Sequence, residues 1–237
     1  MGAYKLGYIH LKMKVFINEP PFINHIGGLK VLRCDNQITK VSYKMAAKAV
    51  KKEVKKEGKV ETRIVNIVVS TSLEHDIPLE KMAATLSNTE YNPEQFPGLV
   101  IRIKEPKTSA LIFSSGKVVC TGARTLENVE KSIKKIIESL KKINIKITVT
   151  PEIKIQNIVA SGSIGMDLNL NTLAMKLDNT EYEPEQFPGL VYKLDEAKAT
   201  FLLFSNGKIV CTGTKSEKEV HSAVEKLIVN LKKVMKT

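Results

Sequence analysis

The feature that most constrains how this chain folds is an internal duplication. Residues 64–143 and 155–234 align without a gap at an offset of 91 residues, and 39 of the 80 aligned positions are identical. The longest shared segments are NTEY(N/E)PEQFPGLV, which begins at Asn88 and at Asn179, and FS(S/N)GK(V/I)VCTG, which begins at Phe113 and at Phe204. One structural unit is therefore expected to occur twice in the fold.

Each repeat predicts the same order of elements: a strand, a short helix, three strands and a long helix. Residues 62–70 are rich in β-branched side chains and predict the first strand, and Pro78 suits the first turn of the short helix. Turn signals then separate a strand over 99–103 from a hairpin over 108–113 and 117–121. Apolar residues at helical spacing predict the long helix; they are Val129, Ile133, Ile136, Ile137 and Leu140 in the first repeat and Val220, Val224, Leu227, Ile228 and Leu231 in the second.

Two short motifs in the second repeat strengthen this prediction. Asn206-Gly207 is a signal for a two-residue hairpin turn. Ser216-x-x-Glu219 is a capping box, in which a hydroxyl and a carboxylate satisfy free N–H groups at the start of a helix. Both motifs lie at the expected boundaries of the hairpin and of the long helix.

These elements predict an α+β fold. The strands form antiparallel pairs, and the two helices of each repeat cover one face of them while the other face stays open. The two tandem repeats, residues 59–150 and 151–237, are expected to form one continuous antiparallel sheet with pseudo-two-fold symmetry. Residues 1–58 are expected to be a basic extension, either disordered or preceding the true translation start.

Charge is unevenly distributed along the chain. The 237 residues hold 37 Lys and Arg against 25 Asp and Glu, a net charge of +12, of which residues 1–58 carry +8 and residues 151–237 carry none. A basic chain is compatible with nucleic acid as a partner, but net charge alone is weak evidence for one. No apolar run is long enough to span a membrane. Three Cys without Cys-x-x-Cys spacing predict neither a disulfide framework nor a zinc site, so we expect no metal and no cofactor.

The open face of the sheet is where a function is expected. Of the five Phe within the repeats, four form equivalent pairs, Phe96 with Phe187 and Phe113 with Phe204. They are either core residues that were duplicated with the gene, or aromatic wedges at the two ends of an exposed apolar surface.

Asparagine in the first strands favours the second interpretation. Asn66 and Asn157 lie mid-strand among Val and Ile, where Asn is disfavoured and needs hydrogen-bond partners if buried. Thr121 and Thr212 occupy equivalent polar positions on neighbouring strands. An apolar surface with paired donors suits the minor groove of A·T-rich DNA, which presents only acceptors, whereas a G·C pair adds a donor that would oppose them.

With these motifs the chain resembles the TATA-binding protein family in its archaeal form. The motifs that carry the resemblance are EY(N/E)PEQFPGLV and FxxGKxVCTG in both repeats, QNIV at 156–159 and RIKEPKT at 102–108, and they extend over residues 62–237. The resemblance implies a saddle, that is, one curved antiparallel sheet with helices on its convex face. It also implies a non-enzymatic general transcription factor that binds the TATA box of double-stranded DNA through its concave face and bends it, located in the cytoplasm with the nucleoid of an archaeal cell.

The resemblance implies site residues position by position. The implied wedges are Phe96 with Phe113 and Phe187 with Phe204; the implied donors are Asn66, Asn157, Thr121 and Thr212; the implied apolar groove contacts are Val68, Val159, Leu111, Leu202, Val119 and Val210. The implied basic residues, which position the phosphates without reading the sequence, are Arg102, Lys117, Arg124, Lys193, Lys208 and Lys215. Transcription factor B is expected to bind Glu183, Glu185 and Gln186, and RNA polymerase to join the complex; Gln186 departs from the apolar residue common in eukaryotic members.

Two alternatives of other classes stay open at this point. The same sheet face suits a non-catalytic, pseudo-dimeric module that binds a protein or a small ligand. A nucleic-acid enzyme such as a glycosylase can share this fold, but it is disfavoured because no second domain with catalytic carboxylates follows the repeats.

Overall fold

The computed structural model describes residues 60–236, so the predicted extension over 1–58 lies outside the described residues. Contacts divide the described chain into two compact units. The first-repeat unit is Val65–Asn157, and the second-repeat unit combines residues 60–64 with 158–236. The boundary falls inside the first strand of each repeat, and each unit therefore includes one end of the other repeat's first strand.

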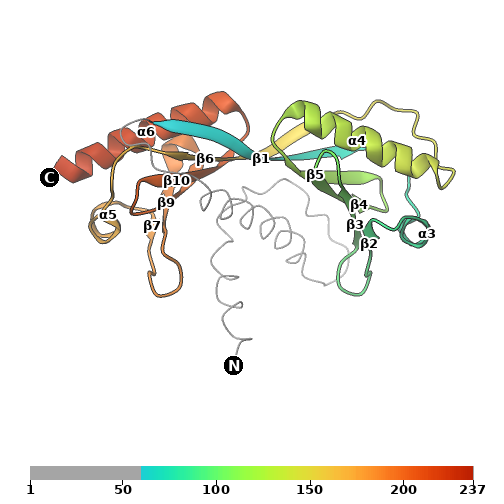
Figure 1. Ribbon diagram of the computed structural model, residues 1–237, viewed down its shortest axis with the longest axis horizontal. Coiled ribbons are helices and arrows are strands. Elements are labelled where there is room, and N and C mark those ends of the chain that lie inside the picture. Colours follow the sequence, from blue (N-terminus) through green and yellow to red (C-terminus); the bar gives the residue numbers. More distant parts are fainter. Residues whose placement is uncertain (1–59, 237) are drawn as a thin grey trace. The chain divides into compact units, whose positions relative to one another are not determined.

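The two repeats form the same elements in the same order (Figure 1). The first repeat contains β1 (Glu61–Ser72), α3 (Leu79–Thr85), β2 (Thr89–Glu90), β3 (Gly98–Ile103), β4 (Thr108–Phe113), β5 (Lys117–Ala123) and α4 (Leu126–Lys141). The second contains β6 (Lys154–Ser163), α5 (Leu170–Lys176), β7 (Thr180–Glu181), β8 (Leu190–Leu194), a 3-10 turn η3 (Asp195–Ala197), β9 (Ala199–Leu203), β10 (Lys208–Thr214) and α6 (Glu217–Lys236).

The strands form one antiparallel sheet. Their order is β2-β3-β4-β5-β1-β6-β10-β9-β8-β7, so each repeat contributes its strands in the same sequence outward from its first strand. The predicted duplication, the α+β class and the single antiparallel sheet are confirmed.

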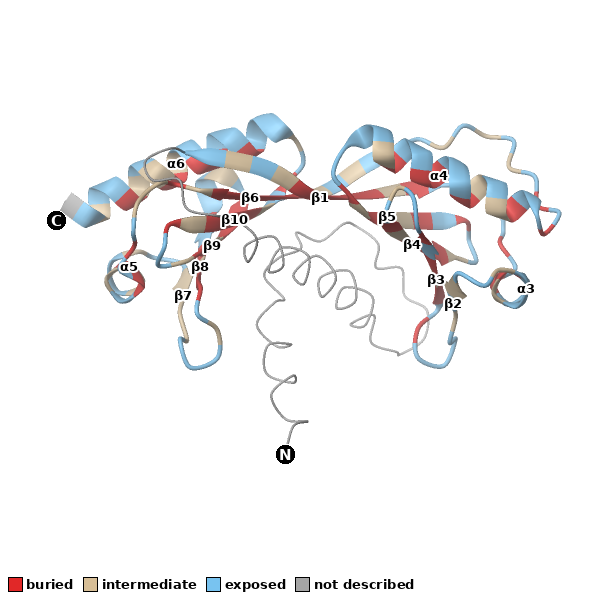
Figure 2. Ribbon diagram, viewed as in Figure 1, coloured by how far each residue is buried: buried red, intermediate tan, exposed pale blue. Residues whose placement is uncertain are grey.

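The long helices bury the predicted apolar stripes against one face of the strands. In α4 the residues Val129, Ile133, Ile136 and Leu140 are buried, and the α4 stripe packs against β5. In α6 the equivalent residues Val220, Val224, Leu227 and Leu231 are buried, and this helix packs against β10. The outward sides of both helices are exposed (Figure 2). Ile137 and Ile228 at the edge of each stripe are only half-buried.

Helix starts follow the predicted capping chemistry with two small differences. Ser216 Oγ accepts a hydrogen bond from the Glu219 N–H at 3.2 Å, and the Glu219 carboxylate accepts from the Lys215 N–H at 2.8 Å, one residue earlier than in the standard capping box. In the first repeat Thr125 Oγ1 accepts from the N–H three residues on, at 3.2 Å. Pro78 is the N-cap residue of α3 and lies just before its first turn.

Both hairpin turns require glycine. Gly116 has φ +77° and Gly207 has φ +70°, a backbone conformation that L side chains rarely adopt. Each glycine also packs against a neighbouring loop: a Cβ on Gly116 would lie 2.3 Å from the His75 carbonyl oxygen, and one on Gly207 would lie 2.1 Å from that of Met166. The turns thereby anchor the loop that follows the first strand of each repeat.

Candidate nucleic-acid interface

Strand pairing places two of the three predicted apolar contacts of each repeat, Leu111 and Val119 or Leu202 and Val210, in one row with a further valine. Val100 of β3 pairs with Leu111 of β4, which pairs with Val119 of β5. In the second repeat Val191, Leu202 and Val210 form the equivalent row. These rows lie on the side of the strands opposite the residues that the long helices cover, because neighbouring side chains alternate.

The two sides of the strands differ in burial. On the α4 side Ile112, Val118 and Cys120 are 0 % exposed. On the other side Leu111 is 8 % exposed and Val119 is half-buried. The side away from the helix is therefore the less enclosed face of this unit, and we call it the open face.

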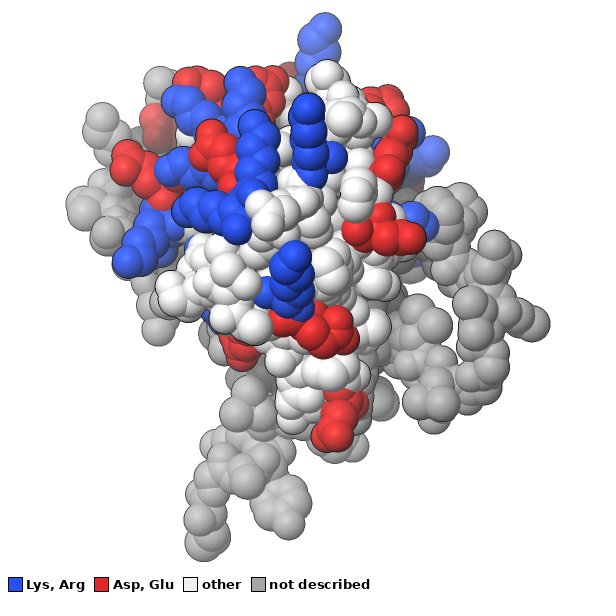
Figure 3. Space-filling model, turned by 90° about the vertical axis from the view of Figure 1, so that its right-hand side faces the viewer, with Lys and Arg blue, Asp and Glu red and all other residues white. Residues whose placement is uncertain are grey.

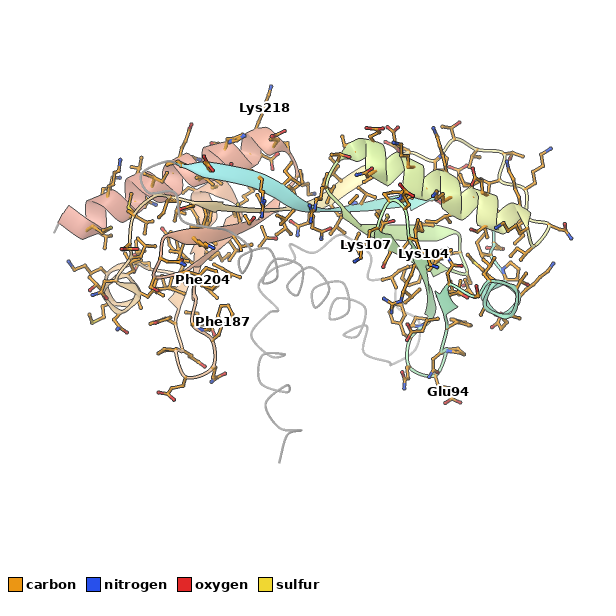
Figure 4. The ribbon with its side chains drawn as sticks, viewed as in Figure 1. Glu94, Lys104, Lys107, Phe187, Phe204 and Lys218 are labelled. Atoms are coloured by element: carbon orange, nitrogen blue, oxygen red, sulfur yellow. The ribbon has the colours of Figure 1, made fainter. Side chains whose placement is uncertain are left out.

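Each repeat holds a pair of phenylalanine rings edge to face. The ring centroids of Phe96 and Phe113 lie 5.9 Å apart with planes at 65°, and those of Phe187 and Phe204 lie 6.0 Å apart at 68°. Figure 4 shows Phe187 and Phe204 together on the side of their unit away from α6. Phe96 and Phe187 lie in the loops before β3 and β8. Phe113 is the last residue of β4, and Phe204 directly follows β9.

The glycine of each Phe-Pro-Gly motif is required by this pair. A Cβ added to Gly98 would lie 2.6 Å from Phe96 Cε1 and 3.1 Å from Phe113 Cε1. At Gly189 the same two distances, 2.6 and 3.1 Å, separate the added atom from Phe187 and Phe204. Because carbon atoms do not approach this closely, the missing side chain is what allows each ring pair to sit on its strand.

Asn66 lies within a network that explains how a polar residue is tolerated inside β1. It is 0 % exposed; its Oδ1 accepts from the Gly122 N–H at 2.7 Å, and its side chain lies 3.1 to 3.2 Å from Thr121 Oγ1. The pairing of β1 with β5 shifts register between Ile67 and Val69, and Gly122 has φ +97° at this β-bulge. Since an N–H must meet the carbonyl oxygen, the bulge fixes the orientation of the amide and assigns its Nδ2 as the donor to Thr121.

The second repeat keeps the same local backbone. Its register shift lies between Cys211 and Thr214, and Gly213 also has φ +97°. Asn157 and Thr212, the equivalents of the first-repeat pair, are half-buried. Sequence equivalence of the donors is therefore accompanied by an equivalent bulge in each repeat.

The proposed site residues differ in exposure. Buried are Asn66, Val68, Phe96, Leu111, Thr121, Val159 and Val210; half-buried are Phe113, Val119, Asn157, Phe187, Leu202, Phe204, Lys208 and Thr212; exposed are Arg102, Lys117, Arg124, Lys193 and Lys215. The apolar and amide groups thus lie within the sheet surface, and most of the cations project from it.

The basic residues at the ends of β3 and β8 form exposed ion pairs. Arg102 Nη2 lies 2.9 Å from the Glu90 carboxylate, and Lys193 Nζ lies 3.2 Å from that of Asp195. Ion pairs this exposed are stabilising by at most about 1 kcal/mol. A phosphate can therefore compete with the carboxylate for each cation.

The loop between β7 and β8 carries the residues expected to contact a protein. Glu185 and Gln186 are exposed and Glu183 is half-buried. The N–H groups of Gln186 and Phe187 both donate to the Glu183 carbonyl, at 3.0 and 2.9 Å. The same turn therefore positions the Phe187 ring and the neighbouring polar side chains.

The two buried cysteine thiols, Cys120 and Cys211, are not reactive at neutral pH. Burial raises the pKa of the Cys120 thiol to about 11 and that of Cys211 to about 12, so both thiols stay protonated at neutral pH. They are small core residues. Among the described residues no helix is long and apolar enough to cross a membrane.

One buried polar contact was not foreseen from the sequence. Thr108 Oγ1 and Ser132 Oγ lie 2.8 Å apart between β4 and α4, and Ser132 also donates to the Asn128 carbonyl at 2.7 Å. The second repeat has Ala199 and Ala223 at the equivalent positions. The second repeat therefore lacks this contact.

Fold and site define a class: a duplicated α+β protein in which each repeat presents a sheet face with apolar rows, amide and hydroxyl donors and an aromatic pair. The family model described as "Transcription factor TFIID (or TATA-binding protein, TBP)" matches residues 61–143 and 152–234. The chain belongs to the TATA-binding protein family. Because this is a family of transcription factors, the expectation that the chain is not an enzyme is confirmed.

Relatives and a solved structure support the assignment. The TATA-box-binding protein of Methanocaldococcus jannaschii is 52 % identical over 170 residues, covering 72 % of this chain and 93 % of the relative. That of Picrophilus torridus is 54 % identical over 171 residues, covering 71 % and 93 %. The solved structure described as "Methanococcus jannaschii TBP" superimposes with a TM-score of 0.68 at 52 % identity, covering 73 % of this chain and 99 % of that one.

Proposed function

We propose that this chain is a general transcription factor that binds TATA-box DNA in the minor groove through its open face and bends it. The observation that carries the proposal is the combination, in both repeats, of an apolar row, an asparagine beside a glycine bulge and an aromatic pair seated on a glycine. The relatives named above are TATA-box-binding proteins, and the same duplicated face is the part of this chain that suits such DNA.

The donors account for a preference for A·T steps. Asn66 Nδ2 and Thr121 Oγ1, which lie 3.1 Å apart on neighbouring strands, are the donors proposed to meet the acceptors of the groove. The minor-groove edges of A·T and T·A pairs present only acceptors, whereas guanine adds an amino donor. Val119, Leu111 and their equivalents supply apolar surface for the floor of the groove.

The aromatic pairs account for bending. Phe113 and Phe204 are only half-buried although their partners and a glycine hold them in place. Apolar side chains that enter between base steps unstack them at a cost of a few kcal/mol, which is offset by the larger contact area of bent DNA. One pair in each repeat provides one kink for each half of the box.

The cations position the duplex without specifying its sequence. Arg102, Lys117 and Arg124 in the first repeat have the equivalents Lys193, Lys208 and Lys215. Contacts of Lys and Arg with phosphates release counterions, and binding should therefore weaken as salt rises.

The β7–β8 loop is the proposed contact for transcription factor B. Glu185 and Gln186 are exposed beside Phe187, so a partner bound there lies next to the kinked end of the box. Recruitment of RNA polymerase through that partner, and association with the nucleoid, follow from this assignment.

Bending of a fluorescently end-labelled TATA duplex tests the wedge assignment in the full chain. Phe113→Ala combined with Phe204→Ala should leave the circular-dichroism spectrum unchanged and abolish the rise in energy transfer between the dyes. Leu126→Ala, which removes an exposed apolar side chain at the start of α4, is the control and should bend DNA normally. Normal bending by the double variant would contradict the wedge role, and unfolding would assign these rings to the core.

A further inference from the structure

The proposed DNA contacts bear on which way round the chain lies on its box. Every apolar, donor and aromatic residue in that set is identical between the repeats: Asn66 and Asn157, Val68 and Val159, Phe96 and Phe187, Leu111 and Leu202, Phe113 and Phe204, Val119 and Val210, Thr121 and Thr212. The three basic pairs also keep their charge. A contact set made of the same side-chain types in both halves gives little chemical basis for one direction over the other, and residues that differ between the repeats can supply it.

The repeats differ by a charge reversal in the turns that follow β3 and β8. Residues 102–107 carry three basic side chains and one acidic one, whereas residues 193–198 carry two of each. The difference is one position, which is Lys104 in the first repeat and Asp195 in the second. Both residues are exposed, and Figure 4 labels Lys104 at the turn between β3 and β4.

Both residues lie near the proposed phosphate contacts in the sequence. Lys104 is two positions beyond Arg102, and Asp195 is two positions beyond Lys193. Lys104 lies in the turn directly after β3, and Asp195 lies in the 3-10 turn η3 directly after β8, so each follows the strand that carries the basic residue. In the described structure Asp195 pairs with Lys193 at 3.2 Å.

Two neighbouring side chains fix the position of the Asp195 carboxylate. Its Oδ2 accepts from Asn179 Nδ2 at 2.9 Å while its Oδ1 faces Lys193. Arg102 instead pairs with Glu90 of β2 at 2.9 Å, and Lys104 adds a further positive charge. The turn after β3 is consequently more positive than the turn after β8.

We propose that Lys104 and Asp195 set the direction in which this chain lies on a DNA box, with the first repeat on the half whose minor groove and flank are more negative. The inference rests on the proposed function, since it concerns the same site. Phosphate potential differs between the two halves of natural boxes because groove width varies with sequence. An exposed charge about 4 Å from a phosphate in water changes affinity about five-fold.

A duplex that differs only in charge isolates this effect. It carries a palindromic A·T box with identical flanks, and neutral methylphosphonates replace the phosphates of one flank. The reporter is iron–EDTA attached to a Ser87→Cys variant of the full chain in which Cys34→Ser removes the third thiol. Ser87 is exposed between α3 and the edge strand β2, and Cys120 and Cys211 are buried, so only the introduced thiol reacts.

Direction is measured as the ratio of cleavage at the two ends of the duplex. Attraction of Lys104 and repulsion of Asp195 each contribute about five-fold, so we expect cleavage at the charged flank to exceed that at the neutral flank by about 25-fold in low salt, and the ratio to fall toward one as salt screens the charges. Lys104→Asp makes the two repeats alike and should bring the ratio to about one. Lys104→Asp combined with Asp195→Lys should invert it.

Two controls separate the possible outcomes. Lys131→Asp makes the same change in net charge on α4, where Lys131 pairs with Glu127 at 2.6 Å on a surface that mixes basic and acidic side chains (Figure 3), and should leave the ratio unchanged. Asp195→Asn keeps an acceptor for Asn179 and should lower the ratio. Box-specific binding with an unbiased wild-type ratio, or with a ratio that the double variant does not invert, would overturn this inference alone. Absence of any preference for the box over a scrambled duplex would overturn the proposed function and this inference together.

Discussion

Replacing Gly98 by alanine tests whether the ring pair depends on its glycine. The added Cβ would lie 2.6 Å from Phe96 Cε1 and 3.3 Å from its Cζ, whereas carbon atoms in contact lie about 3.5 to 4.0 Å apart. The Phe96 ring must therefore move by about 1 Å or rotate away from Phe113. The backbone φ of Gly98 is not in the positive region, so the strand itself accepts alanine.

The magnitude follows from two opposing effects. Overpacking costs about 1–3 kcal/mol, and replacing a strand glycine by alanine returns about 0.5–1 kcal/mol of backbone entropy. The net loss of about 0–2.5 kcal/mol corresponds to at most about 10 °C in Tm for a domain of this size. The protein should fold, with one ring pair displaced.

The assay is energy transfer across an end-labelled TATA duplex. Gly98→Ala should reduce bending at one end, Gly189→Ala should reduce it to a similar extent because its distances are the same, and the double variant should reduce it further. Ser115→Ala, an exposed change in the β4–β5 turn, serves as the control. Bending by both glycine variants equal to that of the unsubstituted protein would refute the claim that glycine seats the rings.

Two further predictions concern stability. Thr214 is 1 % exposed and its hydroxyl has no hydrogen-bond partner within residues 60–236, while the first repeat has Ala123 at this position. Thr214→Val should therefore raise the free energy of unfolding, measured by urea denaturation, by about 1 kcal/mol. A loss of stability would show that the hydroxyl is needed. The pKa values of Cys120 and Cys211 are raised by burial to about 11 and about 12 from an ordinary 9.0, so above pH 9 the unfolded chain loses thiol protons that the folded chain keeps. Stability should then fall as pH rises from 9 towards 11, and a smaller fall in Cys211→Ala would confirm the cause; equal slopes would contradict it.

Elements with local signals were predictable. The hairpin predicted over 108–113 and 117–121 has the bounds of β4 and the start of β5, because glycine at the turn and alternation along the strands specify a hairpin within a few residues. The long helices were predictable because apolar residues at helical spacing are also a local signal. By contrast, the two-residue edge strands Thr89–Glu90 and Thr180–Glu181 have no pattern of their own, since they depend on pairing with β3 and β8.

The candidate site likewise contains features that the sequence predicts and features that it does not. The aromatic pairs and the asparagines could be located because they recur at one offset among residues of another type. The bulge at Gly122 could not, because it arises where β1 and β5 pair 55 residues apart and shift register. The contact between Gly98 and its two rings was equally hidden, since it depends on where Phe113 of the neighbouring strand lies.

The most direct test of minor-groove binding compares three duplexes that differ only in the central steps of the box. These steps are A·T, G·C or inosine·C, which has the minor-groove edge of A·T because inosine lacks the 2-amino group, and the major-groove edge of G·C. At fixed salt, the full chain should bind the inosine duplex with nearly the affinity of the A·T duplex, and the G·C duplex at least about ten-fold more weakly, since each unsuitable step costs about 1–3 kcal/mol. Binding of the inosine duplex as weakly as the G·C duplex, or equal binding of all three, would contradict the account.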